Sequence, residues 1–416
     1  MKKSTSNTQL VHADRLLNRP QHGAVHEATN NSVLFEFEDV AQLESVFQGK
    51  EAGHVYSRSS SGSAVALQNM LCALEDGVGA VAFATGMAGI SGVLFSLLKA
   101  GDHIIVSQFL FGNTRSFMET LQQFGIQISF VDVSYAQCVQ DAINENTTLV
   151  FCESIANPGT QVSDIEGIVK LCTEHDLLFI LDNTMTPATM LNAKALNVSM
   201  IVTSLTKYIG GHGNVLGGAA VDLGNYNWEN FSNISDKYKV ADTSQWGLTQ
   251  IRKRGLRDMG ATLAPASAHQ ISVGLETLNL RLDKTCINAM AIAKFLDTHA
   301  SVAKVFYPGM PEHPQHARAK ALFNGQFGGI LSFELNNNID MRKFLNALQL
   351  VICATHLGDT RTLALPVATT IFYENGPEQR EVMGIGDSMI RMSIGIEDAQ
   401  DVIDDIAQAL AVCSER

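Results

Sequence analysis

The chain has 416 residues, of which 46% are hydrophobic and 17% charged, and its formal net charge is −13. This length allows two or three domains with a sizeable core, and the composition argues against both a disordered chain and a membrane-spanning one. The acidic balance argues against a general nucleic-acid binder, which needs a basic face to neutralise phosphates.

The cysteines and the first residues suggest where the protein works. The seven cysteines are an odd number, lie scattered and include no C-x-x-C pair, which favours a reduced cytoplasm over a disulfide framework or a zinc site. Residues 1–7 carry positive charge, but no apolar segment follows them, so we expect no signal peptide. We therefore expect a cytoplasmic protein with no metal site and no membrane or nucleic-acid partner.

In chain order, residues 1–60 are polar and lack a sustained period, which indicates an N-terminal arm. Helical spacing begins near Ser61, and Ser61 or Ser63 could cap that helix. Short apolar runs then alternate with amphipathic stretches; the runs predict strands at 80–84, 104–106, 126–131, 149–152, 177–181 and 200–202. Continuous apolar strands separated by helices are typical of an α/β fold with a parallel sheet covered on both faces.

The second half of the chain predicts a smaller unit. A long helical pattern at residues 267–299 is expected to join the sheet to a second domain, in which 329–333 and 389–394 are predicted strands among helices. We therefore predict an arm at 1–60, a large domain at 61–263 and a smaller α+β domain at 264–416.

Polar clusters follow four of the predicted strands. Ligands of parallel α/β sheets bind at the carboxyl ends of the strands, so these clusters should converge on one edge of the sheet. They lie at residues 85–87, 153–157, 182–184 and 204–207.

The cluster at Gly86 and Met87 opens a helix directly after a strand, so its backbone N–H groups and helix dipole favour an anion. Ser204 and Thr206 can add hydroxyl donors, and Lys207 lies beside them in a Gly-rich loop, where it is either solvated or held by a ligand. A dinucleotide fingerprint and a P-loop are both absent, which argues against nucleotide ligands.

Asp182 ends an apolar strand, where a carboxylate is costly to bury without a cationic partner. A protonated pyridine nitrogen would be such a partner; a helix N-cap or an ordinary salt bridge is the alternative. A lysine for an imine, an aspartate for a ring nitrogen and donors for a phosphate are what pyridoxal 5'-phosphate requires.

Arg391 lies on a predicted strand whose residues Ile390, Met392 and Ile394 share the opposite face. An arginine in this position can grip an amino-acid carboxylate with two hydrogen bonds, or it can be an ordinary surface arginine.

With these residues in hand, the chain resembles the Cys/Met-metabolism family of pyridoxal-phosphate enzymes, which includes cystathionine γ-lyase and γ-synthase, methionine γ-lyase and the acylhomoserine sulfhydrylases. The resemblance runs from about residue 20 to the C-terminus and implies the type I fold of such enzymes, with a mostly parallel seven-stranded sheet. It depends on the segments Tyr56-Ser57-Arg58, Ala84-Thr85-Gly86-Met87-Ala88, Glu153-Ser154-Ile155-Ala156-Asn157-Pro158, Leu181-Asp182-Asn183-Thr184, Ser204-Leu205-Thr206-Lys207-Tyr208 and Arg391-Met392-Ser393-Ile394-Gly395-Ile396-Glu397.

The resemblance also implies roles for individual residues. Lys207 would be the Schiff-base lysine and the main catalytic residue, Asp182 would hold the ring nitrogen, and Asn157 and Arg391 would bind the substrate carboxylate. The phosphate would be bound by Gly86, Met87, Ser204 and Thr206, and by Tyr56 and Arg58 of the arm of a neighbouring subunit. The last two imply a homo-oligomer, expected to be a dimer of dimers.

Several positions depart from the family pattern on the substrate side. Phe111 replaces the tyrosine that stacks on the cofactor, which keeps the stack and loses a phenol that could act in catalysis. Asn113 stands where methionine γ-lyases carry a cysteine, which argues against that activity. His356 replaces a serine before Leu357 and would line the substrate side.

The favoured reaction is γ-elimination on cystathionine, which gives cysteine, 2-oxobutyrate and ammonia, and the partner is in any case a small sulfur amino acid. The alternatives are γ-replacement on an O-acylhomoserine and, after these, methionine γ-elimination. A cofactor-binding protein silenced by its changes at Phe111 and His356 is a further possibility.

Overall fold

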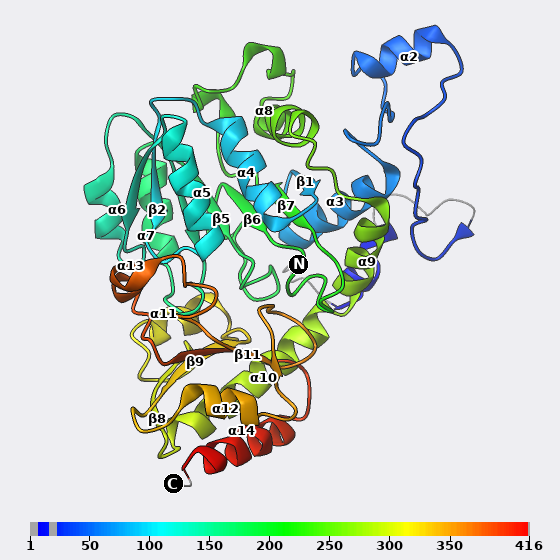
Figure 1. Ribbon diagram of the computed structural model, residues 1–416. Helices are drawn as coiled ribbons and strands as arrows, with labels where there is room; N and C mark the ends of the chain where they lie inside the picture. Colours follow the sequence, from blue (N-terminus) through cyan, green and yellow to red (C-terminus); the bar gives the residue numbers. More distant parts are fainter. Residues whose placement is uncertain (1–6, 16–22, 415–416) are drawn as a thin grey trace.

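The computed structural model describes residues 7–15 and 23–414, arranged around two β-sheets (Figure 1). The start of the chain, where we expect no signal peptide, lies largely outside these residues. Within them, no helix is both long and apolar enough to cross a bilayer.

The larger sheet has seven strands in the order β1-β7-β6-β5-β4-β2-β3, and β7 alone runs antiparallel to its neighbours. This confirms the mostly parallel sheet that the apolar runs predict. The strands are β1 (Gly79–Phe83), β2 (His103–Ser107), β3 (Gln127–Val131), β4 (Thr147–Glu153), β5 (Leu178–Asp182), β6 (Met200–Thr203) and β7 (Gly218–Asp222).

Helices cover both faces of this sheet. Successive strand residues point to opposite faces, and they enter two separate cores: Ile105 and Val150 belong to one, Ile104 and Leu149 to the other. The first core is completed by α3 (Gly62–Glu75), α6 (Ala136–Ala142) and α7 (Ile165–Glu174), and the second by α4 (Gly86–Leu97), α5 (Gly112–Gln123) and α8 (Trp246–Gln250). As predicted, Ser61 caps α3.

After β7 the chain runs through several short helical segments before the two long helices that lead to the second sheet. It contains short 3-10 helices at Trp228–Asn230, Asp236–Tyr238 and Thr243–Gln245, and α8 continues into a π-helix at Ile251–Asp258.

The smaller sheet has five strands in the order β10-β11-β12-β9-β8. Its strands are β8 (Val302–Phe306), β9 (Ile330–Leu335), β10 (Ile352–Cys353), β11 (Leu363–Pro366) and β12 (Met389–Ser393), with helices α11 (His316–Leu322), α12 (Met341–Ala347), α13 (Gly376–Val382) and α14 (Ala399–Ser414). Together the two sheets confirm the predicted fold class.

The single helix predicted at residues 267–299 is wrong, because the structure has two helices there, α9 (Pro265–Glu276) and α10 (Leu278–Asp297). They meet at Thr277, where Arg281 of α10 donates to the carbonyl oxygen of Gly274 and to the Thr277 hydroxyl. These tertiary hydrogen bonds cannot be read from helical periodicity. α10 still runs from the large sheet towards the small one, as expected (Figure 1).

The N-terminal segment contains α1 (Asn7–Val11), a 3-10 helix at Ala13–Arg15 and α2 (Val40–Phe47). Leu10 is buried, whereas α2 stands apart from both sheets (Figure 1) and leaves Val40 and Phe47 68% and 65% exposed.

Candidate active site

A cavity of about 530 Å³ lies at the carboxyl ends of β4, β5 and β6 and at the start of α4. All four polar clusters predicted at the strand ends contribute to its wall, which confirms that they converge. On the side of the smaller sheet, the cavity is lined by Arg391 and by the segment around Leu357. Phe111, the N-cap residue of α5, and Asn113 in the first turn of α5 also line it.

Lys207 lies in a tight turn directly after β6. Its N–H donates to the Ser204 carbonyl oxygen over 3.2 Å, and its own carbonyl accepts from Gly211 over 2.7 Å. Arg281 fixes the next turn from outside by donating to the carbonyl oxygens of Tyr208 and Ile209 over 2.6 and 3.3 Å. Gly211 has φ of +72°, and a Cβ there would meet the Arg281 guanidinium, so glycine is required.

The environment of Lys207 destabilises its charged ammonium form. Burial, with a smaller contribution from Arg391, lowers the pKa of Lys207 to about 8. The amine lies 3.3 Å from Nδ1 of His356. Burial, followed by the Lys207 charge, lowers the pKa of His356 to about 4, so this imidazole is neutral at pH 7. A lysine with a lowered pKa is suited to attack a carbonyl group.

Asp182 and Glu153 lie on neighbouring strands in register with each other. Burial raises the pKa of both carboxyl groups, that of Glu153 to about 8 with Asp182 as the second cause. Asp182 accepts the Thr184 N–H over 2.9 Å, and Glu153 accepts the Phe111 N–H over 2.9 Å. A cationic ring nitrogen in the cavity would compensate the buried Asp182 charge.

The start of α4 forms the anion-binding end of the cavity. Thr85 caps the helix by accepting the Ala88 N–H over 3.0 Å, and the first-turn residues Gly86 and Met87 line the cavity beside Ser204. A Cβ at Gly86 would lie 2.8 Å from the Cβ of Ser204, so glycine permits this close approach. Helix N–H groups beside a hydroxyl suit a phosphate. Thr206 also lines the cavity, but its hydroxyl exchanges hydrogen bonds with the backbone of Gly217.

Arg391 is 2% exposed, so its interpretation as a surface arginine is wrong. Its guanidinium donates to the Asn157 side chain over 3.3 Å and to the carbonyl oxygens of Thr355 and His356 over 3.1 and 3.0 Å. All three acceptors are neutral, so among the described residues the charge of this buried cation is not compensated. The geometry therefore suits a ligand carboxylate.

Two predicted residues lie away from the cavity. Tyr56 is 45% exposed and Arg58 is also exposed, and the guanidinium carbon of Arg58 lies 5.5 Å from the centre of the Tyr56 ring. Within one chain they do not reach the other candidate residues.

Glu153 lies in one of the predicted polar clusters, but no role was predicted for it. The contacts of Arg281 with the turn after Lys207 were not predicted. The signal for Glu153 was a carboxylate at the end of an apolar strand, the same signal that identified Asp182. No sequence signal sets Arg281 apart, because Asp283 and Lys284 follow it on the same helix.

A second cavity of about 550 Å³ adjoins the first, since Asn113 and Ile371 belong to both. Its wall is more polar and includes Arg115, Glu119 and Glu374. Among the described residues, no group of three or more His, Cys, Asp or Glu side chains could hold a metal ion.

Comparisons with known proteins point in the same direction as this geometry. Residues 7–411 match the family model described as Cys/Met metabolism PLP-dependent enzyme. The chain is 36% identical over 414 residues to an L-methionine gamma-lyase of Fusobacterium nucleatum, covering 99% of both chains.

Two solved structures are similar over almost their whole length. A Campylobacter jejuni protein described as an O-acetylhomoserine (thiol)-lyase, with a pyridoxyl-lysine monophosphate, matches with a TM-score of 0.92 and 30% identity over 97% of this chain and 99% of that one. The cystathionine gamma-lyase of Lactobacillus plantarum, complexed with L-serine, matches with a TM-score of 0.85 and 30% identity over 98% of each chain.

Proposed function

Since the chain belongs to the Cys/Met metabolism family of pyridoxal-phosphate-dependent enzymes, we propose that it is a carbon–sulfur γ-lyase acting on L-cystathionine. The observation that carries this proposal is that one cavity brings together Lys207, Asp182 and Arg391. These residues are suited to bind a carbonyl group, a cationic ring nitrogen and a carboxylate, respectively.

The cofactor site is assigned to the residues at the sheet edge. Lys207 Nζ would form the bond to the cofactor, Asp182 would pair with its ring nitrogen, and Phe111 would pack against its ring. The N–H groups of Gly86 and Met87 and the hydroxyl group of Ser204 would bind the phosphate, and the Thr206 hydroxyl would join them by giving up its hydrogen bond to the Gly217 carbonyl oxygen. When bound, pyridoxal phosphate supplies an electron sink for negative charge that develops at the substrate Cα.

The remaining steps are assigned to side chains of this chain. Arg391 and Asn157 would bind the substrate carboxylate and hold the substrate beside Lys207. Lys207 Nζ would move one proton away from Cα and then take a second proton from Cβ. The γ-substituent would leave as a thiolate and take up that second proton from the Lys207 ammonium group. Phe111 has no hydroxyl group and therefore cannot protonate the departing sulfur.

The adjoining polar cavity favours cystathionine over shorter substrates. Cystathionine carries a second charged amino-acid group beyond its sulfur atom, and the cavity beyond Asn113 and Ile371 offers charged side chains such as Arg115 and Glu119. The L-methionine gamma-lyase and O-acetylhomoserine (thiol)-lyase relatives motivate methionine γ-elimination and γ-replacement as the second candidates.

A substrate panel on the purified holoenzyme tests the proposal. We expect 2-oxobutyrate from cystathionine without any added thiol, and no product from Lys207→Ala. Replacement of Ile371 by Trp should narrow the passage between the cavities and reduce turnover of cystathionine more than that of methionine. A wild-type enzyme that releases 2-oxobutyrate only from methionine, or that reacts only when an acylhomoserine and a thiol are supplied together, would refute the cystathionine assignment.

We further propose that the protein is a homo-oligomer, in which the arm at residues 1–60 completes the site of a neighbouring subunit. This is supported by the exposure of Tyr56 and Arg58 and by the exposed apolar side chains Leu34, Val40 and Phe47 of the same segment.

A further inference from the structure

His356 is the side chain that contacts the amine of Lys207. Its Nδ1 lies 3.3 Å from Lys207 Nζ, and the two residues are 149 positions apart in the chain. With a pKa of about 8, Lys207 is mostly protonated at pH 7, and an ammonium group can only donate hydrogen bonds. In this form Nδ1 is the acceptor and the imidazole proton is on Nε2. Nε2 is buried without a hydrogen-bond partner among the described residues.

The segment that carries His356 is fixed to the backbone of Lys207. Gly358 has φ of +73°, and a Cβ there would lie 2.7 Å from the Tyr208 nitrogen and 3.0 Å from the Lys207 carbonyl carbon. The Gly358 N–H donates to the Ser393 hydroxyl over 2.9 Å. No larger residue could bring this segment so close to the lysine.

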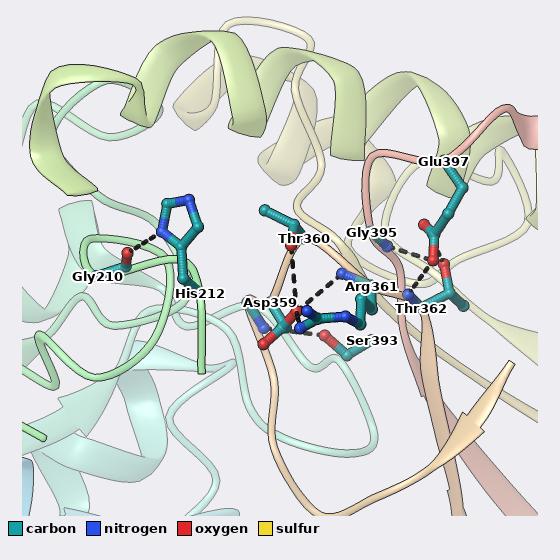
Figure 2. A network of polar contacts seen from close by, with 10 residues as sticks. Gly210, His212, Asp359, Thr360, Arg361, Thr362, Ser393, Gly395 and Glu397 are labelled. Atoms are coloured by element: carbon teal, nitrogen blue, oxygen red, sulfur yellow. Dashed lines mark hydrogen bonds and ion pairs between the residues drawn. The ribbon is translucent and has the colours of Figure 1, made fainter. Parts of the chain in front are cut away.

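Hydrogen bonds fix the segment on both sides of this contact. Upstream, Arg391 donates to the carbonyl oxygen of Thr355, and it also donates to that of His356 itself. Downstream, Asp359 accepts the Arg361 N–H over 2.9 Å (Figure 2). The Thr362 hydroxyl donates to Glu397 over 2.8 Å and accepts the Gly395 N–H over 3.0 Å. The imidazole is therefore a rigid partner for a long and flexible side chain.

We propose that His356 is a positioning residue, which holds the Lys207 amine through Nδ1 so that the lysine can capture the cofactor and return to the substrate. This inference rests on the proposed function of Lys207. A neutral acceptor suits this role, because a carboxylate would hold the lysine as a charged ion pair. Of the charged groups that act on the imidazole, Lys207 and Arg391 oppose its protonation and Asp359 favours it.

The test distinguishes the effect of the hydrogen-bond acceptor at Nδ1 from the effect of the space that the imidazole ring fills. His356→Asn keeps an oxygen acceptor near the position of Nδ1, His356→Leu removes it at similar size, and His356→Gln moves it towards the position of Nε2. His212→Leu is the matched control, since His212 belongs to the same loop as Lys207 but is exposed and contacts only the Gly210 carbonyl among the contacts drawn in Figure 2.

The primary measurement is the rate at which Lys207 reacts with pyridoxal phosphate, and it does not require the enzyme to convert a substrate. Apoprotein is mixed with pyridoxal phosphate, samples are reduced with borohydride at intervals, and the modified Lys207 peptide is measured by mass spectrometry. We expect adduct formation at least about tenfold slower in His356→Leu and His356→Gln, the size of one charge-assisted hydrogen bond, and within about threefold of wild type in His356→Asn. His212→Leu should match wild type.

Equal rates in wild type and His356→Leu would overturn the inference, as would an equal loss in the Asn and Leu variants. Melting curves exclude unfolding, and His356→Gln decides the result if the leucine variant does not fold. If the wild type forms the adduct but releases no product from any sulfur amino acid, the lyase proposal fails while the adduct rates still decide the role of His356.

Discussion

Arg391 is a buried cation with only neutral partners in the described chain, and this makes it the sharpest test of substrate binding. Arg391→Lys keeps the charge but loses the planar fork. We expect kcat/KM for sulfur amino acids to fall roughly ten- to a hundredfold, because hydrogen bonds to charged groups contribute about 1.5–3 kcal/mol each. The control is Arg361→Lys, whose side chain is 63% exposed. Steady-state kinetics with unchanged kcat/KM would refute the carboxylate assignment.

At this scale the sequence could predict some residues and not others. Asp182, Lys207 and Gly86 each lie at or just after the end of an apolar run. Because ligands of parallel α/β sheets bind at the carboxyl ends of the strands, these three residues could be predicted to share one site. The burial of Arg391 could not be predicted. The alternation along its strand shows that Arg391 points to the face opposite Ile390, Met392 and Ile394, but it does not show whether other residues cover that face. The contact between His356 and Lys207 depends on how two sheets pack together, and no local pattern encodes that.

The start of α4 allows a prediction that compares two helices. Gly86 and Gly62 are each the first residue after a hydroxyl N-cap, but only Gly86 has a close neighbour, Ser204. Gly86→Ala should push the helix away from Ser204 at a cost of about 1–3 kcal/mol. We therefore expect the dissociation constant of pyridoxal phosphate to rise at least about tenfold, measured by cofactor absorbance, with little change in Gly62→Ala. Equal affinities would show that this turn does not hold the phosphate.

The contact between the end of α3 and the end of β5 gives a pH-dependent prediction. Glu75 is buried, accepts the Asn183 side-chain N–H over 3.0 Å, and has its pKa raised by burial to about 7. A raised pKa means that the folded protein binds this proton more tightly than the unfolded chain. Its contribution to stability is therefore complete below about pH 4.5 and is lost as the pH rises through about 7.

Glu75→Gln cannot ionise and still offers an acceptor to Asn183. It should match the wild type in free energy of unfolding at about pH 4, below the unfolded pKa, and exceed it by about 3 kcal/mol at pH 9. Denaturant unfolding at both pH values measures this difference, and the exposed Glu145→Gln is the control. A constant difference across the pH range would mean that Glu75 is ionised in the folded protein.

The sequence predicts the existence of β1 to β6, β9 and β12, but it predicts neither β7, β8, β10 and β11 nor the break within a helix. The apolar runs mark β1 to β6, because buried parallel strands are apolar throughout. The division between α9 and α10 depends on Arg281, whose guanidinium also pins the turn after Lys207. One arginine thus shapes both the scaffold and the candidate site, through contacts that sequence periodicity does not record.

At the scale of the whole molecule, the candidate site is divided between two sheets and, as proposed, between two subunits. Arg58 lies outside the cavity of its own chain, so its proposed phosphate contact requires a neighbour with two-fold symmetry. A mixing experiment can test this directly. Arg58→Ala damages the site of the neighbouring subunit, whereas Lys207→Ala damages the site of its own subunit.

In a hybrid dimer of these two variants, one site therefore has both an intact Lys207 and an intact partner arm. If equal amounts are unfolded, mixed and refolded, random pairing makes half of the dimers hybrids with one intact site in two, so about one quarter of wild-type activity should return. A mixture of Lys207→Ala and Asp182→Ala is the control, because both changes damage the site of their own chain and no hybrid has an intact site. Mass spectrometry of the intact dimers verifies that hybrids form. Hybrids without recovered activity would mean that Arg58 does not serve a neighbouring site, since every other group needed for the reaction is present in them.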